Sequence, residues 1–376
     1  MNAVVGAVAA SQGALAITAD VADERVCAVC VTSSRPTHLS RLFIGRPAQE
    51  APLLAERIFS LCGVSHRVVA ARAIARARQE PICARRNRGE AIALIADGIG
   101  AALRSNMILA LDGDAGRSDL DHIRAVGDLM SLLRDLCSAT EARASERSEN
   151  RKKTKALIRN IRALGVALYA RGPQAERGPT SRFPFERLEK EFAAGDSFRV
   201  APPDSLGDAD DLEVMQRMRR EGASFAAMPY LQGRAPETGA FARRWAQTDF
   251  SKGALAARLQ ARVIDITARF AELEDAERDP LASHALSPSS REGFATVETS
   301  RGRLYHWVRL AADGRIEDYR IVAPTEWNFH PSGPFVEALL GSAVSRGRAE
   351  RGIAQLAGLF DPCVPFRVEV KEHRHA

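Results

Sequence analysis

The 376-residue sequence has few aromatic residues, few cysteines and no long apolar run. Only 6% of its residues are aromatic, and no basic stretch is interleaved with aromatic side chains, which argues against a nucleic-acid-binding surface. No run of about eighteen apolar residues occurs, so the sequence predicts no membrane span. The six cysteines are sparse for so long a chain, and the first twenty residues lack a secretory signal pattern. We therefore expect a cytoplasmic protein with reduced thiols.

Charged residues are abundant but nearly balanced. The chain has 53 Lys and Arg against 47 Asp and Glu, a formal net charge of +6. Most arginines alternate with acidic residues or alanine along apparent helices, which is typical of solvated helix faces. With 45% hydrophobic residues, a chain of this length can bury a sizeable core.

The apolar patterning predicts long helices and small sheets. Strands 15–18 and 26–31 are expected to form a hairpin, and strands 304–310 and 316–322 a second one around Asp313-Gly314. Helices are expected at 53–77, 88–111, 119–140 and 334–360. Residues 185–270 have a mainly helical but irregular pattern.

Two cysteines stand in stretches that suit a ligand site. Cys363 lies in GLFDPCVPFRV between two prolines, which fix the backbone and remove two amide donors. Cys62 precedes Gly63, which permits close approach, and His66 follows one turn later. Each thiol is compatible with a metal ligand or with an ordinary buried cysteine, and Cys62 also with a nucleophile paired with His66.

The other four cysteines carry weaker signals. Cys27 and Cys30 have the spacing of half a zinc site, but no second pair completes it and the stretch has a strand pattern. Cys83 and Cys137 are interpreted as buried or half-buried thiols. The closing HRHA is expected to be a solvated tail.

A guanidinium and a hydroxyl stand at the two ends of the second predicted hairpin. Arg301 comes just before its first strand, and Pro324 and Thr325 come just after its second. Such groups can converge on one small anionic ligand. A surface arginine and a turn threonine are the alternative, which the spacing alone leaves open.

The order of these segments resembles the large subunit of nickel-iron hydrogenases. In that family an early R-x-C-G-x-C motif and a terminal D-P-C-x-x-C motif supply four cysteines to the metal site, and here they read SLCGVS and DPCVPF. The segments ETSRGRLYHW, DGRIEDY and PTEWN resemble further family motifs. The resemblance implies an α+β fold with a long-helix core and small peripheral β-sheets. It implies one unit over 1–376, with the first motif in 1–140, a divergent helical middle in 141–290 and the second motif in 291–376.

The departures from the family pattern point to a non-catalytic member. Ser65 and Phe366 replace the second cysteine of each motif; serine is a poor ligand for a soft metal and phenylalanine is none, so no nickel is expected. The chain in this respect resembles hydrogenase accessory proteins of the HupK/HoxV type. That resemblance implies a scaffold that carries or receives an Fe(CN)2(CO) unit, with Cys62 and Cys363 as iron ligands and Arg301, Pro324 and Thr325 around the cyanides.

The same resemblance implies the partners. They are the hydrogenase maturation chaperone, the iron-assembly complex and the immature hydrogenase large subunit. An alternative is a non-metal structural or quinone-site subunit of a redox complex with the same fold, as in respiratory complex I. A degenerate enzyme with residual redox activity is a third reading, which the loss of both bridging thiols disfavours.

Overall fold

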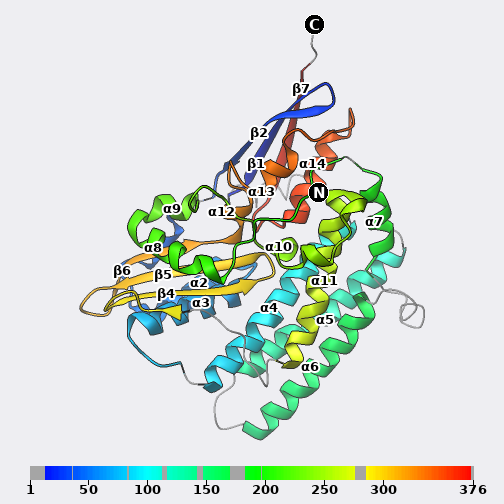
Figure 1. Cartoon of the computed structure of the whole chain (residues 1–376). Helices are drawn as coiled ribbons and strands as arrows, with labels where there is room; N and C mark the ends of the chain where they lie inside the picture. The colour runs from blue at the N-terminus through cyan, green and yellow to red at the C-terminus, as the bar shows by residue number, and fades with distance from the viewer. Residues whose placement is uncertain are drawn as a thin grey trace.

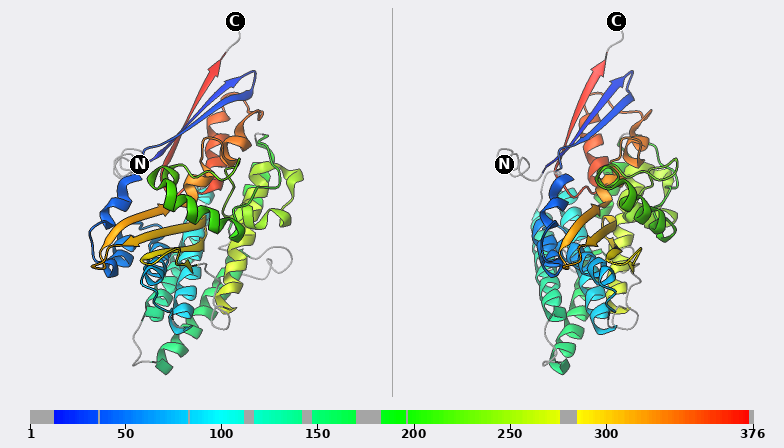
Figure 2. Two further views of the ribbon diagram at one scale, coloured as in Figure 1. Left: turned by 60° about the vertical axis from the view of Figure 1, so that its left-hand side comes forward. Right: turned by 90° about the vertical axis from the view of Figure 1, so that its left-hand side faces the viewer.

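Long helices form one side of the molecule, a four-stranded sheet lies beside them, and a three-stranded sheet projects from the top in the view of Figure 1 (Figures 1 and 2). The computed structural model describes residues 13–35, 37–82, 84–111, 117–141, 147–169, 183–195, 197–275 and 285–373. Cys83 therefore lies outside the described residues.

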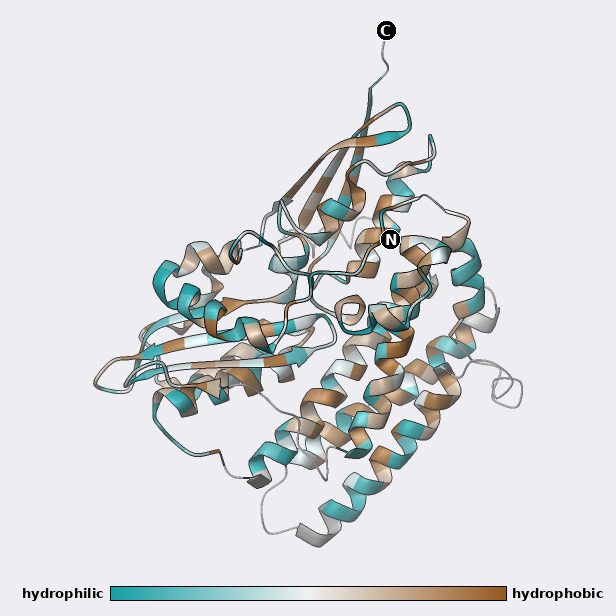
Figure 3. Cartoon of the chain, viewed as in Figure 1, coloured by the Kyte–Doolittle hydropathy of each residue, from teal (hydrophilic) through white to brown (hydrophobic). Residues whose placement is uncertain are grey.

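The long helices pack side by side as a bundle. They are α4 (Ala84–Leu111), α5 (Arg117–Glu141), α6 (Arg147–Tyr169) and α11 (Gly253–Asp275). Helix α5 packs between α4 and α6, and α11 packs against α4 and α6. Apolar side chains recur at helical spacing on the faces that meet, as the brown stripes in Figure 3 show. The helices predicted at 88–111 and 119–140 are thus confirmed.

One of these helices is apolar enough to raise the question of a membrane. By length and composition alone, the segment Arg86–Ala110 of α4 could cross a bilayer. In the structure, 72% of the most apolar window is buried inside the protein, against α5 and α11. The hydropathy of α4 is therefore accounted for by its place in the core.

A four-stranded antiparallel sheet, in the order β3-β4-β5-β6, lies beside the bundle. Its strands are β3 (Ala285–Leu286), β4 (Glu292–Thr299), β5 (Gly302–Leu310) and β6 (Ile316–Val322). Helix α3 (Gly63–Ala77) packs across β4 and β5, so one face of the sheet is covered. The predicted hairpin is confirmed, and Gly314 takes the positive φ of +81° that its turn requires.

A three-stranded sheet projects from the body and joins the two ends of the described chain (Figure 1). Strand β1 (Leu15–Ala22) pairs antiparallel with β2 (Arg25–Ser33), which confirms the first hairpin, and parallel with β7 (Phe366–His373). The first residue of the expected solvated tail, His373, is exposed as expected, although it ends β7 opposite Ala22. The remaining residues of HRHA lie outside the described part.

Two predicted helices are interrupted. The helix expected at 53–77 is α2 (Ala51–Ile58) followed by α3 (Gly63–Ala77), and the one expected at 334–360 is α13 (Pro334–Leu339) followed by α14 (Ala349–Phe360). At the first break, a Cβ on Gly63 would lie 2.7 Å from the Glu56 carbonyl oxygen, so glycine allows α3 to start against α2. At the second, Gly341 and Gly347 have positive φ, which ends helical geometry.

Short elements connect these layers. They are η1 (Thr37–Phe43), η2 (Ala48–Glu50), α7 (Phe185–Ala193), η5 (Asp208–Asp210), α8 (Asp211–Glu221), α9 (Ala223–Ala227), α10 (Ala240–Arg244), η6 (Trp245–Gln247), η7 (Phe250–Lys252) and α12 (Pro324–Asn328). Most of them fall in the region predicted as helical and irregular. Among them, η1, α9 and α12 contribute residues to the pocket described below.

Candidate functional site

The break between α2 and α3 and the loop between α14 and β7 meet at one pocket of about 270 Å³. Cys62 and Cys363 both line it, although they belong to opposite ends of the sequence. Burial and the neighbouring Cys363 raise the pKa of the Cys62 thiol to about 12. The Cys62 thiol is therefore protonated and must lose its proton to bind a metal.

Cys62 is held at the start of α3. Its amide donates to the Phe59 carbonyl at 3.0 Å, and its carbonyl accepts from the His66 amide at 3.1 Å. The thiol thus stands at a helix N-terminus, where the helix dipole favours negative charge. The helix break that the sequence pattern missed is what places it there.

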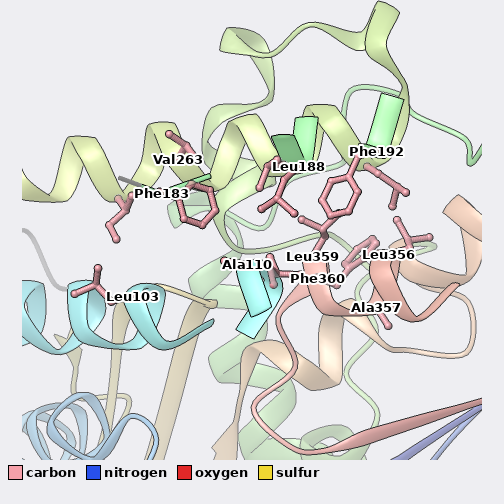
Figure 4. Close-up of a cluster of buried hydrophobic side chains, with 14 of the residues drawn as sticks. Leu103, Ala110, Phe183, Leu188, Phe192, Val263, Leu356, Ala357, Leu359 and Phe360 are labelled. Carbon is pink, nitrogen blue, oxygen red and sulfur yellow. The ribbon is translucent and has the colours of Figure 1, made fainter. Parts of the chain in front are cut away.

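Cys363 is fixed from both sides of its loop. Before it, α14 is anchored by Leu356, Leu359 and Phe360, which pack towards α7 (Figure 4). Helix α14 ends at Asp361, which takes the left-handed conformation (φ 56°), and the Asp361 carboxylate accepts from Ser105 Oγ at 2.6 Å. After it, the Pro365 carbonyl accepts from the Leu15 amide at 2.9 Å, where β7 joins β1. The flanking prolines therefore belong to a short, fully anchored loop.

Arg301 sits in the tight turn between β4 and β5, with its side chain only 8% exposed. Its Nε lies 3.5 Å from Asp361 Oδ1, yet neither Nε nor Nη1 has a hydrogen-bond partner among the described residues. Unpartnered buried donors are costly. Since Arg301 lines the pocket, the arrangement suits an anionic acceptor there.

Pro324 and Thr325 begin α12 on the same side of the pocket. Pro324 lines it, and the Thr325 hydroxyl donates to Cys363 Sγ at 3.2 Å while accepting from the Cys363 amide at 3.1 Å. The single proton of this hydroxyl is therefore already engaged by the cysteine. Four of the five predicted site residues thus line the pocket, and the fifth, Thr325, is next to it, where it positions Cys363.

A buried row of hydrogen-bonded rings, from His66 through His306 to Tyr319, also reaches the pocket. The sequence analysis did not identify His306 and Tyr319. His66 lines the pocket, its Nδ1 lies 3.0 Å from His306 Nε2, and His306 Nδ1 lies 2.7 Å from the Tyr319 hydroxyl. Burial lowers the pKa of His306 to about 3 and that of His66 well below its usual value, so both rings are neutral. The Tyr319 hydroxyl has no other acceptor among the described residues, so it donates to His306 Nδ1. His306 then carries its proton on Nε2 and donates it to His66 Nδ1. His66 then carries its proton on Nε2.

Two further pocket residues also lacked a signal in the sequence. Arg35 follows β2, and its Nη1 donates to Glu326 Oε1 of α12. Arg35 belongs to no periodic pattern and to no segment that resembles the family, and Glu326 stands in PTEWN, which does not by itself pair it with Arg35. Only the folded chain brings the end of β2 beside α12.

The residues that replace the family's second cysteines have structural contacts of their own. The Ser65 amide and hydroxyl both donate to Asp97 Oδ2, at 3.1 and 2.6 Å. Phe366 begins β7 opposite Leu15 and packs against the main hydrophobic core. Neither is among the described residues that line the pocket.

The remaining described cysteines lie elsewhere. Cys27 and Cys30 are exposed on β2, where the Cys27 thiol donates to the Asp20 carbonyl at 3.2 Å, and Cys137 packs against the core from α5. Within the described residues, no group of three or more His, Cys, Asp or Glu side chains could hold a metal ion. The pocket accordingly offers two thiol ligands.

Comparisons with known proteins place this geometry in context. The family model described as nickel-dependent hydrogenase matches residues 224–368. The chain is 35% identical over 374 residues to the hydrogenase expression/formation protein HupK of Rhizobium leguminosarum bv. viciae, covering 96% of this chain and 97% of that protein. It is 28% identical to the hydrogenase expression/formation protein HoxV of Cupriavidus necator, over 91% of this chain and 93% of that one.

A solved structure shares the fold. A chain of the nickel-iron-selenium hydrogenase of Desulfovibrio vulgaris Hildenborough superposes with a TM-score of 0.66 at 15% identity, over 91% of this chain and 94% of that one. At this identity the likeness establishes the arrangement of helices and sheets.

Proposed function

The chain belongs to the HupK family of hydrogenase expression/formation proteins, and from that membership we propose that it is a non-catalytic scaffold for an iron unit. It carries or receives Fe(CN)2(CO) as cargo, bound by Cys62 and Cys363, on the way to the immature hydrogenase large subunit. The hydrogenase maturation chaperone and the iron-assembly complex are the proposed partners. The observation that carries the proposal is the presence, in one pocket, of two cysteines and a buried Arg301 guanidinium whose Nε and Nη1 make no hydrogen bond among the described residues.

The number of thiols suits transfer better than permanent retention. Binding forms two Fe–S bonds and releases the two thiol protons, without any change in the oxidation state of iron. The diatomic ligands fill most other coordination positions, so two thiolates suffice. A four-cysteine acceptor can then displace them by ligand exchange.

Infrared spectroscopy tests the proposal directly. Protein purified anaerobically from cells that express the iron-assembly proteins is expected to show cyanide and carbonyl stretching bands together with bound iron. Protein from cells without the assembly complex serves as the control and is expected to lack the bands. A wild-type preparation without such bands, from cells with active hydrogenase, would refute the carrier role.

Arg301→Lys is expected to weaken retention of the iron unit by roughly tenfold or more while the protein stays folded. Lysine keeps the charge but loses the planar set of donors, and a hydrogen bond to a charged group contributes about 1.5 to 3 kcal/mol. The measurement is hydrogenase activity in cells carrying the variant, beside infrared spectra of the purified protein. Unchanged activity and unchanged cyanide bands would remove Arg301 from the site.

Nickel is expected to bind weakly and hydrogen is expected not to be turned over. The pocket has two thiols where nickel in the catalytic family relies on four, because Ser65 bonds to Asp97 and Phe366 lies in β7. The measurements are the metal content of protein from nickel-replete cells and hydrogen-dependent dye reduction. Stoichiometric nickel or dye reduction would contradict the expectation.

A further inference from the structure

The pocket has a second guanidinium that faces the cysteine pair. Arg35 lines the pocket together with Cys62, Cys363 and Arg301. Arg35 enters the pocket from the end of β2, whereas Arg301 enters it from the β4–β5 turn. We propose that Arg35 is a second anion-binding group, which makes the pocket select iron that carries anionic ligands over the bare metal ion. This inference rests on the proposed function and adds a specificity residue to it.

The backbone at Arg35 is firmly placed. Its amide donates to Ser33 Oγ at 3.2 Å, and Gly13, which precedes β1, packs directly against it. A Cβ on Gly13, which has a φ of +76°, would lie 2.7 Å from the Arg35 Cα, so only glycine permits this approach. The side chain is 15% exposed, which keeps it beside the pocket and away from bulk water.

The negative groups around Arg35 keep its guanidinium charged. Burial alone would lower the pKa of its guanidinium, but Cys363, Glu326 and Cys62 together outweigh burial and raise the pKa. Both cysteines are thus within electrostatic reach of Arg35. Glu326 positions the group from α12 through Arg35 Nη1.

Arg35 has donors left for an occupant. A guanidinium has five N–H groups, and among the described residues the side-chain hydrogen bonds of Arg35 go to Glu326 alone. Thr325 is a weaker candidate for a second anionic ligand, because its hydroxyl proton is donated to Cys363. Two anionic ligands on one iron therefore find two guanidinium groups, Arg301 and Arg35, from different elements of the fold.

Charge explains the selectivity. Two thiolates already neutralise a ferrous ion, and two bound cyanides then give the complex a net charge of minus two. Glu326 and Asp361 already pair with Arg35 and Arg301, so the remaining N–H groups of the two guanidiniums stabilise the dianion by donating to its cyanides, whereas bare ferrous iron with two thiolates offers no such acceptor. Loss of Arg35 should therefore penalise the cyanide-bearing complex far more than the bare ion.

The test compares two probes on the purified, anaerobic full-length protein: ferrous iron alone, and ferrous iron with carbon-13-labelled cyanide. Arg35→Gln is expected to reduce retention of the cyanide-bearing iron by about tenfold or more and to shift its cyanide band. Retention of ferrous iron alone is expected to change less than about threefold. Arg41→Gln, an exposed arginine on η1, is the matched control and should behave as wild type.

A second variant guards against a folding defect. Arg35→Lys keeps the charge next to Glu326 but has fewer donors, so an intermediate loss with an unchanged unfolding transition is expected. If Arg35→Gln retains the cyanide-bearing iron as well as wild type while Arg301→Lys does not, Arg35 is not an anion-binding group and the carrier proposal stands. If wild type retains no cyanide-bearing iron, the carrier proposal fails and this inference fails with it.

Discussion

Replacing Cys363 or Cys62 with serine is expected to reduce the bound iron unit to background and to abolish the protein's contribution to hydrogenase assembly. Serine is nearly isosteric, but its hydroxyl is a poor ligand for iron carrying cyanide and carbonyl groups. Two thiols line the pocket among the described residues, so losing one leaves a single thiol ligand there. The measurements are iron content, the infrared bands, and hydrogenase activity in cells whose only copy is the variant.

Cys30→Ser is the matched control for these variants. Cys30 is exposed on β2 and away from the pocket lining, so this change should leave iron, bands and hydrogenase activity at wild-type levels. If either pocket variant, Cys62→Ser or Cys363→Ser, retained full cyanide and carbonyl bands, that cysteine would not be an iron ligand. Equal losses in Cys30→Ser would instead indicate an unspecific effect of removing a thiol.

The fold class and the place of the candidate site could be predicted from the sequence. The α+β fold with a long-helix core and small peripheral sheets is confirmed, both by the structure and by its likeness to a solved hydrogenase. Local patterns were sufficient for α4, α5 and both hairpins, since each has a clear apolar period or turn residue. Cys62, Cys363 and Arg301 could be singled out because each stands in a short motif beside glycine or proline.

What the sequence could not show depends on contacts between distant segments. Strand β7 has no local partner, and its pairing with β1 spans nearly the whole chain. The helix break before Gly63 depends on a backbone contact with the Glu56 carbonyl, and the spacing of apolar residues carries no information about such a contact. Arg35 is one arginine among many until β2 is placed beside α12. Its role at the pocket therefore becomes visible only in the folded chain.

The close packing of α3 on β4 holds the two halves of the pocket together. Helix α3 begins beside Cys62 and includes His66, while β4 leads directly into the turn with Arg301. Gly293, near the start of β4, is a point where the two backbones approach closely. A Cβ there would lie 1.8 Å from the Ala73 carbonyl oxygen and 2.6 Å from the Ala77 amide nitrogen.

Gly293→Ala is therefore expected to lower the free energy of unfolding by about 3 kcal/mol or more, or to prevent folding. Both clashing atoms belong to the α3 backbone, so no side-chain rotation can relieve the overlap, and helix and sheet must separate. Such a loss is a large part of the roughly 5 to 15 kcal/mol that stabilises a typical native protein. Urea unfolding measures the loss, and the same separation should move Cys62 away from Arg301 and weaken iron retention.

Gly127→Ala is also a glycine-to-alanine change, but it is expected to stabilise the protein. Gly127 is exposed inside α5, and a Cβ there meets no atom within 4 Å, so alanine should stabilise the helix by about 0.5 to 1 kcal/mol. Because α5 contributes no residue to the pocket lining, iron retention should stay at the wild-type level. If Gly293→Ala were as stable as wild type, α3 and β4 could not be packed as closely as described. If Gly127→Ala were less stable than wild type and Gly293→Ala equally stable, both expectations would be wrong. The close contact between α3 and β4 would then not be what holds Cys62 beside Arg301.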